Sequence, residues 1–314
     1  MKRALCLGLA LLAVGAGGCQ RLNSWQKTTF LYFDTVCEIQ LYCSASTYAE
    51  ARHSLERIFE ETTRLFSPGS SEYSASWVRE LFAQAKDVYL RSQGCFDLSV
   101  GALSELWGFH GGEHRVPAAE EIQVALLHVG MDKIRILPDG LGVPDGMGLD
   151  WGAIAKGFGI DRAARALIEM GVERGLINAG GDLFCWGANP RGRPWQVGVK
   201  HPRDGGYLGV LSLSELGAAT TGDYQRFFIR DGIRFHHVFD PRTGQPAQGK
   251  QSVTVVGPET SLCDALSTAL FVSESPEEIL QSYPDYGAFL VDSQGKLTSL
   301  GKSYSLKPWP QNGP

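Results

Sequence analysis

The 314-residue sequence contains no CxxC pair, no basic run, no internal repeat and no low-complexity linker. The missing CxxC argues against a zinc site and a redox dithiol. The missing basic run, in a chain of net charge −5, argues against nucleic acid as a partner. Without a repeat, a solenoid is excluded. What remains is ordinary globular composition, 43% hydrophobic and 20% charged, long enough for one or two domains.

A long apolar run occurs only at the N-terminus. Two basic residues precede apolar or small residues at positions 4–16, and Ala16-Gly17-Gly18 leads to Cys19. This order predicts a secretory signal over residues 1–18 that is too short to span a bilayer. Small residues directly before a cysteine resemble a bacterial lipoprotein processing site. We therefore expect lipidation of Cys19, a tether over residues 19–27, and a protein anchored to the membrane of the bacterial cell envelope and facing the periplasm. A plain signal peptide and an uncleaved anchor are the alternatives.

Five cysteines follow Cys19, and an odd number cannot pair completely. Cys37 and Cys43 share one face of an alternating segment with Ile39 and Leu41. A bridge between two cysteines of one extended strand exceeds the reach of a disulfide. We predict that they are buried as small apolar residues.

Hydrophobic periodicity predicts an α+β fold. A capping box at Thr47 and Glu50 opens the first helix. Helices are predicted over residues 47–66, 74–92, 117–130, 152–170 and 259–273, with a short one after Pro276. Strands are predicted over residues 28–43, 133–137, 287–292 and 297–300, with short strands and a hairpin at 230–232 between 183 and 257. Hairpin spacing favours antiparallel pairing over parallel βαβ winding. We place one domain at residues 28–304 and a tail at 305–314.

Two stretches near glycines carry polar groups that a core does not need. Asp97 lies among apolar residues and needs hydrogen-bond donors, either from a ligand or from a turn that it caps. Residues 149–161 open a helix that holds three glycines and Lys156. The free N–H groups of a helix start suit a phosphate, and Lys156 adds a charge. The alternative is a surface helix that tolerates glycine. The spacing matches neither common nucleotide-binding motif.

Two further stretches carry a histidine pair and a carboxylate–hydroxyl pair. His236 and His237 are adjacent on a predicted strand and point to opposite faces, so only one is expected to face a site. A single imidazole at the site suits general acid–base catalysis, whereas a zinc site chelated by both histidines is not expected. Asp264 and Thr268 lie four apart on one helix face, a pair of hard oxygens that suits magnesium. The alternative is an aspartate that complements the helix dipole and a threonine bonded to its own helix.

Together these stretches resemble the ApbE family, the FAD:protein FMN transferases. The resemblance covers roughly residues 28–300 and rests on pieces in family order: FDLSVGALSELWGF, LDWGAIAKGFGID, LINAGGD, TTGDYQRFF, HHVFDPRTG and VTVVGPETSLCDALSTALF. It implies a T-fold-like architecture of largely antiparallel or mixed sheets flanked by helices. It also implies Mg²⁺-dependent transfer of FMN from FAD onto a threonine hydroxyl of an acceptor flavoprotein, with release of AMP.

The resemblance also implies roles for individual residues. The Ala153 carbonyl, Asp264 and Thr268 fall on the magnesium ligands, and His237 falls on the catalytic base. His236 is then the outward neighbour. Cofactor-binding positions fall on Asp97, Lys156, Asp223 and Val238, and on Phe66 and Ser67. The segment 67–72 departs from the family, because it is shorter and lacks an aspartate. Asn178, Gly180, Gly181 and Asp182 resemble the family's glycine turn.

Two other functions stay open at this point: an FAD pyrophosphatase that gives FMN and AMP, and a non-enzymatic FAD-binding lipoprotein. Glycine density indicates where FAD would bind. Glycine makes up 38 of 314 residues, and ten of these lie within residues 146–187. We expect backbone there to lie against the dinucleotide.

Overall fold

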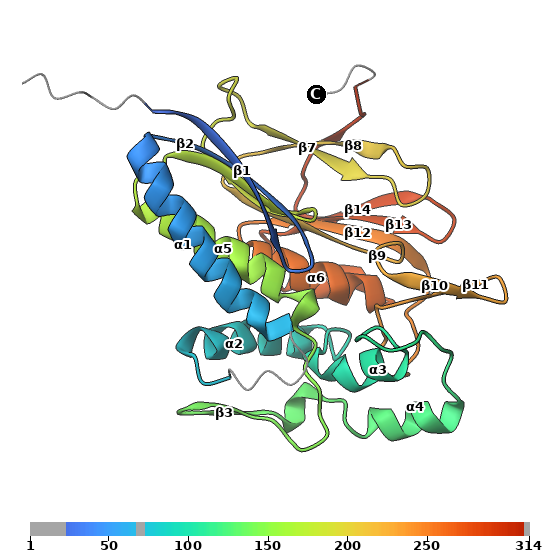
Figure 1. Cartoon of the computed structure of the whole chain (residues 1–314). Coiled ribbons are helices and arrows are strands. Elements are labelled where there is room, and N and C mark those ends of the chain that lie inside the picture. Colours follow the sequence, from blue (N-terminus) through green and yellow to red (C-terminus); the bar gives the residue numbers. More distant parts are fainter. Residues whose placement is uncertain (1–22, 67–72, 311–314) are drawn as a thin grey trace, which may run out of the picture.

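The computed structural model describes residues 23–66 and 73–310, and within them the largest unit is an eight-stranded sheet (Figure 1). Its strand order is β1-β2-β5-β6-β9-β12-β13-β14, and every neighbouring pair is antiparallel. The preference for hairpin pairing over βαβ winding is therefore confirmed. The strands are β1 (Ser24–Tyr32), β2 (Thr35–Cys43), β5 (Arg174–Ala179), β6 (Asp182–Trp186), β9 (Leu216–Gly222), β12 (Lys250–Gly257), β13 (Gly287–Asp292) and β14 (Leu297–Gly301).

Three helices cover one face of this sheet, α1 (Ala45–Thr63), α5 (Ala155–Glu169) and α6 (Thr260–Val272), with α6 over β9 and β12 (Figure 1). The first begins earlier than its capping box predicted, because the Ser44 hydroxyl accepts the Thr47 N–H and so caps it. The start of α6 is capped from outside: Asp161 of α5 accepts the N–H groups of Thr260 and Ser261. The α5–α6 contact is thus fixed by polar bonds at the first turn of α6.

A small sheet covers the other face, made of β15 (Leu306–Lys307), β8 (Tyr207–Leu213) and β7 (Trp195–Lys200). Side chains of both sheets form one apolar cluster that includes Trp195, Leu211, Cys185 and Phe289. The predicted tail is therefore part of the fold, because β15 pairs with β8 and Trp309 stacks on Tyr207. The predicted tether is also shorter, since β1 begins at Ser24. Residues 1–22, with the signal and Cys19, lie outside the described residues.

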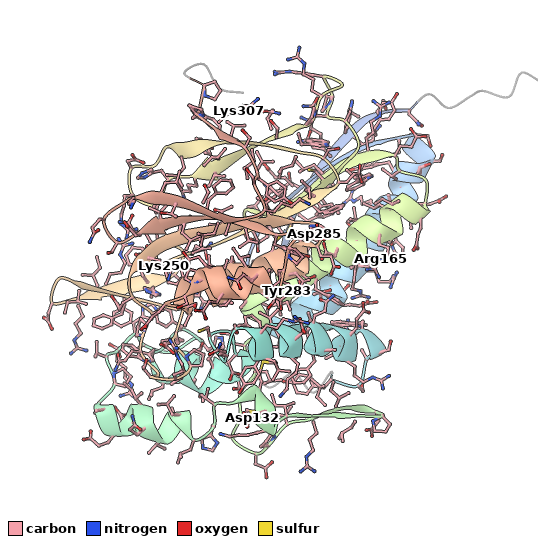
Figure 2. All side chains as sticks on the ribbon, turned by 180° about the vertical axis from the view of Figure 1, so that it is seen from behind. Asp132, Arg165, Lys250, Tyr283, Asp285 and Lys307 are labelled. Carbon is pink, nitrogen blue, oxygen red and sulfur yellow. The ribbon has the colours of Figure 1, made fainter. Side chains whose placement is uncertain are left out.

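Further elements complete the fold, and α2 (Ser76–Arg91), α3 (Gly101–Leu106) and α4 (Ala119–Leu126) lie beyond the helical layer (Figure 1). Another helix is α7 (Pro276–Gln281). Short 3-10 turns are η1 (Arg64–Phe66), η2 (Leu98–Val100), η3 (Met131–Lys133) and η4 (Trp151–Ala153), and two hairpins are β3 (Arg135–Leu137) with β4 (Gly140–Gly142) and β10 (Phe227–Arg230) with β11 (Ile233–His236). Seen from behind, Tyr283 lies beside α6 and α2, and its hydroxyl donates to Asp87 of α2 (Figure 2).

Buried cysteines are confirmed. Cys37 and Cys43 face the core together with Ile39 and Leu41, and the five cysteines after Cys19 are all buried and free. Their environment raises the thiol pKa, mainly through burial, at Cys185 to about 12. Across residues 23–66 and 73–310, no helix is both long and apolar enough to cross a membrane.

Candidate active site

Most of the predicted site residues line one cavity of about 990 Å³, at the upper end of the usual size of a ligand site. It is bounded by the first turn of α5, the inner face of α6, the ends of β9 and β11, and the loops around α3. The predicted residues on its wall are Phe66, Asp97, Ala153, Lys156, His237, Val238, Asp264 and Thr268. They come from sequence positions up to 200 apart, so the fold itself assembles the site.

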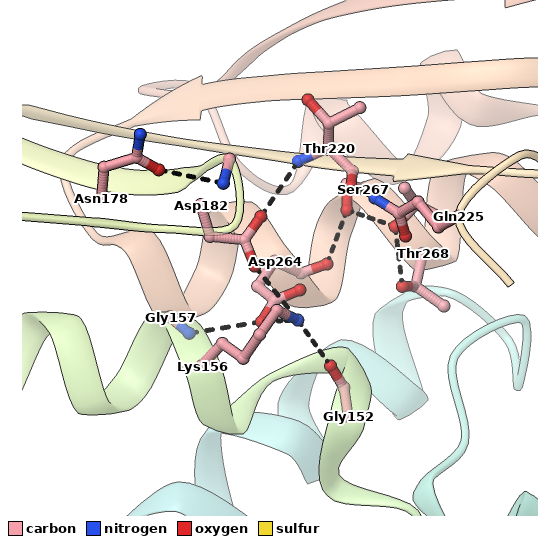
Figure 3. A network of polar contacts seen from close by, with 12 residues as sticks. Gly152, Lys156, Gly157, Asn178, Asp182, Thr220, Gln225, Asp264, Ser267 and Thr268 are labelled. Atoms are coloured by element: carbon pink, nitrogen blue, oxygen red, sulfur yellow. Dashed lines mark hydrogen bonds and ion pairs between the residues drawn. The ribbon is translucent and has the colours of Figure 1, made fainter. Parts of the chain in front are cut away.

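Lys156 bridges two buried carboxylates at the centre of this wall (Figure 3). Its Nζ lies 3.1 Å from Asp182 Oδ2 and 3.6 Å from Asp264 Oδ2, and it donates to the Gly152 carbonyl at 2.9 Å. The two carboxylates raise the pKa of Lys156 against the opposing effect of burial, so the ammonium stays charged. When both carboxylates are ionised, this cluster carries one net negative charge.

Gly157 makes this cluster possible by letting α5 touch α6. A Cβ at Gly157 would lie 2.6 Å from the carbonyl carbon of Thr260 and 2.7 Å from Ser261 Cα, with the Thr260 oxygen closer still. Only glycine permits such an approach of two helix backbones. The Gly157 N–H also donates to Asp264 Oδ2 at 3.3 Å. A missing side chain therefore sets the distance between Lys156 and Asp264.

The predicted magnesium ligands fit a hard cation. Asp264 and Thr268 both reach the cavity from one face of α6, as their spacing predicted, and Ala153 closes the η4 turn opposite them. The donors are a carboxylate, a hydroxyl and a carbonyl, all hard oxygens. Burial, with the neighbouring Asp182 charge, raises the pKa of Asp264 to about 7, against the lowering effect of Lys156. Thr268 is not bonded to its own helix; its hydroxyl contacts Thr221 Oγ1 at 3.1 Å.

The two histidines diverge as the strand argument predicted. His237 follows β11 and lines the cavity, with its Nδ1 3.2 Å from the Arg226 carbonyl. Burial, helped by the Arg226 charge, lowers the pKa of His237 to about 4, so the imidazole is neutral at pH 7. His236 does not point outward: it is buried, and its Nε2 contacts the Ala247 carbonyl at 2.8 Å. β11 ends over the core at His236, and the ring of this residue packs against Phe271.

Asp97 serves as a turn cap at the cavity wall. Its Oδ1 accepts the N–H of Ser99 at 2.7 Å, and its Oδ2 accepts the N–H of Met131 at 3.2 Å. The capping interpretation therefore holds for the carboxylate, and the residue also lines the cavity.

Asp223 is the exception among the described candidates. It lies just after β9, outside the residues that line the cavity. Its carboxylate is held by Arg203, at 2.8 and 2.6 Å, and approached by Arg234 at 3.4 Å. These two arginines hold its carboxylate outside the cavity, and an ion pair with residues of other segments leaves no sequence signal of its own. The candidate Ser67 lies outside the described residues.

Comparison with known proteins agrees with this architecture. The model of the ApbE family matches residues 33–290. The chain belongs to the ApbE family.

Relatives of the family match along most of this chain. The FAD:protein FMN transferase of Rhodobacter capsulatus is 33% identical over 300 residues, covering 87% of this chain and 57% of that protein. That of Haemophilus influenzae is 34% identical over 227 residues, covering 68% of this chain and 64% of that protein. The matches thus span less than two thirds of the length of these two curated relatives.

Solved ApbE structures share the fold. The ApbE protein of Thermotoga maritima aligns with a TM-score of 0.81 and 29% identity, covering 88% of this chain and 97% of that one. The flavinyl transferase ApbE of Pseudomonas stutzeri aligns with a TM-score of 0.75 and 29% identity, covering 88% and 95%. The predicted α+β architecture, with antiparallel sheets flanked by helices, is confirmed.

Several polar residues of the cavity, among them His110, Asp150 and Arg226, are not among the site residues that the ApbE resemblance implies. His110 and Asp150 both line the cavity, and Asp150 stands inside a motif quoted for the family. No periodicity marks His110, which follows α3 in a loop 40 positions before its partner. The GGD turn was a usable signal for Asp182: Gly180 and Gly181 have positive φ and place Asp182 at the start of β6.

Proposed function

We propose that this chain transfers the FMN moiety of FAD onto a threonine hydroxyl of an acceptor flavoprotein and releases AMP. The observation that carries the proposal is the meeting, in one cavity, of a hard-oxygen donor set with a neutral imidazole. Asp264 and Thr268 supply the first with Ala153, and His237 supplies the second. The names of the curated relatives, FAD:protein FMN transferases, support the same reaction.

Magnesium would be held by the Ala153 carbonyl, the Asp264 carboxylate and the Thr268 hydroxyl. When bound, it neutralises phosphate charge and polarises the phosphorus toward attack. With Asp264 ionised, the net negative charge of the Lys156–Asp182–Asp264 cluster favours such a cation. Because Lys156 is tied to both carboxylates, its role is to hold them in place and to limit their mutual repulsion.

His237 would handle the proton of the reaction. In its neutral form it accepts the proton of the threonine hydroxyl as that oxygen attacks the FMN phosphorus. A bond forms between the threonine oxygen and this phosphorus, while the bond from the phosphorus to the bridging oxygen breaks. The electron pair leaves with AMP, and the proton resides on His237. The protein itself needs no nucleophile.

The location of the protein is a further part of the proposal. The order of residues 1–19 supports export and lipidation at Cys19, which would place the domain at the bacterial cell envelope, anchored and facing the periplasm. Acceptors in that compartment would then be within reach. Mass spectrometry of the mature N-terminus tests this part: a lipid-modified Cys19 supports it, and an unmodified or uncleaved terminus contradicts it.

One incubation tests the reaction. The protein without residues 1–18 is mixed with FAD, Mg²⁺ and a threonine-bearing acceptor, and flavin fluorescence of the acceptor is read after denaturing electrophoresis. A labelled acceptor supports the proposal. Free FMN and AMP without label indicate a pyrophosphatase, and tight FAD binding without turnover indicates a storage protein. An acceptor with the threonine replaced by alanine is the matched control.

A further inference from the structure

A second histidine faces the cavity and is not part of the chemistry above. His110 follows α3, and its Nε2 lies 3.4 Å from Asp150 Oδ2. The two side chains are partly exposed to the cavity, 24% and 26%. Among residues 23–66 and 73–310, the His110 ring has one polar partner, Asp150, which its Nε2 approaches, whereas an imidazolium has two donors. One N–H of His110 is therefore available to a ligand.

Asp150 is held firmly enough to orient His110. Its Oδ1 accepts the Gly152 N–H at 2.9 Å, and its Oδ2 accepts the Ser104 hydroxyl at 3.0 Å. Its own N–H donates to the Leu98 carbonyl at 2.7 Å. These bonds come from three different segments, so the carboxylate has one position. Asp150 is also the N-cap of η4, which ends at Ala153, so the same residue fixes both the turn and the histidine.

The charge state of His110 follows from this pairing. His110 and the donors around it hold the pKa of Asp150 well below its usual range despite burial. In return, the hydrogen bond to Asp150 raises the pKa of His110, against desolvation and the nearby Arg226. His237 shifts the opposite way in the same cavity. When the pKa values of two titratable groups in one site shift in opposite directions, as those of His110 and His237 do, the two groups usually have different roles.

The other cations on the wall have contacts of their own, and among them Lys156 is paired with carboxylates. The Arg226 guanidinium donates to the Phe109 carbonyl, and Lys200 lies over the ring of Tyr224. The Arg226 guanidinium keeps further N–H groups, so an anionic ligand near His110 would meet two cations, the Asp150-oriented imidazolium and this guanidinium.

We propose that His110, oriented by Asp150, binds a phosphate group of the dinucleotide as a cation. The inference rests on the proposed function for the identity of the ligand. It gives a phosphate group of that ligand a contact that the magnesium donors do not supply. His110 is the binding residue, and Asp150 is a positioning residue. Charge-assisted hydrogen bonds to phosphate are among the stronger polar contacts in proteins.

The test compares ligands with and without phosphate. His110→Gln keeps the size of the side chain but cannot be charged, and FAD and riboflavin affinities are read from quenching of flavin fluorescence. FAD should bind His110→Gln roughly 10-fold more weakly, with riboflavin unchanged. Equal weakening of both ligands, or no weakening, overturns the proposal. His201→Gln is the control, because His201 pairs with Asp204 at 2.6 Å but does not line the cavity.

Two more measurements distinguish a failure of this inference from a failure of the proposed function. FAD affinity should fall as the pH rises through the titration of His110, and this fall should be absent in His110→Gln. The charged groups that act on His110 are Asp150, Arg226 and Glu105, and of the two histidines that line the cavity only His110 has a raised pKa. Wild-type transfer is assayed in parallel. Transfer with unchanged His110→Gln binding refutes this inference alone, whereas phosphate-dependent binding without transfer refutes the proposed function alone.

Discussion

Replacing Gly157 by alanine tests whether the α5–α6 contact sets both stability and the site. The added Cβ would meet only backbone atoms of the first turn of α6, the nearest carbon at 2.6 Å. Ordinary contacts begin at 3.4 Å, so the two helices must separate by about 1 Å. That turn is held in place by Asp161, whose carboxylate accepts the N–H groups of Thr260 and Ser261. The atoms that the Cβ would meet all belong to the backbone, so no flexible side chain can move to relieve the strain.

The magnitude follows from two opposing effects. Overpacking of this kind costs about 1–3 kcal/mol of unfolding free energy, and alanine in a helix regains about 1 kcal/mol over glycine. Because both partners are backbone, we take the upper end and expect a net loss of about 2 kcal/mol. For a domain of this size the unfolding midpoint should fall by about 4–8 °C. Transfer activity should fall as well, since Gly157 bonds to Asp264.

Urea unfolding of Gly157→Ala is compared with that of Gly159→Ala, two positions along the same helix. A Cβ at Gly159 meets the tip of the Phe33 ring at 2.9 Å and a methyl of Thr62 at 3.3 Å, which are side-chain atoms and can move. Both changes gain the same helix propensity, so Gly159→Ala should lose less. A Gly157→Ala protein as stable as the wild type, or less affected than Gly159→Ala, would refute the reasoning.

Three further predictions concern the chemistry. His237→Ala should slow transfer by roughly 10²–10⁴-fold with FAD still bound, and a wild-type rate in the acceptor assay would mean another base. Because the neutral form of His237 is the base and its pKa is lowered to about 4, the contribution of His237 to the rate, measured at saturating FAD and Mg²⁺, should be constant above about pH 5 and decline in proportion to acid below pH 4; a His237-dependent loss near pH 6.5 would contradict this. Asp264→Ala should abolish Mg²⁺-dependent turnover, whereas Asp285→Ala, at a surface side chain that is 67% exposed (Figure 2), should leave it intact. Unchanged activity in Asp264→Ala would remove that ligand assignment.

The parts of the site that were predictable are those set by local geometry. Asp264 and Thr268 share a helix face because of their spacing, and the spacing alone brings both to the cavity. His236 and His237 face opposite sides because strand side chains alternate. These rules need no knowledge of what lies across from the element. For the same reason they could not tell that His236, at the end of β11, is buried.

The parts that were not predictable depend on long-range pairing. Lys156 meets Asp182 and Asp264 from 26 and 108 positions away, and His110 meets Asp150 from 40. Asp223 looked like a site residue in its motif but its carboxylate is held outside the cavity by Arg203, which belongs to another segment. No periodicity encodes such pairs, because each residue satisfies its local pattern equally well without the partner.

The ten glycines of residues 146–187 show local geometry and long-range packing acting in the same segment. Half of them line the cavity: Gly146, Gly148, Gly152, Gly180 and Gly181. Others serve packing, since a Cβ at Gly157 would strike α6 and one at Gly175 would strike the ring of Trp186. The two uses meet in the first turn of α5, which touches α6 through Gly157 and carries Lys156 to the cavity. Close helix packing is thus the cause of the site's geometry, so a change aimed at packing is also a test of the site.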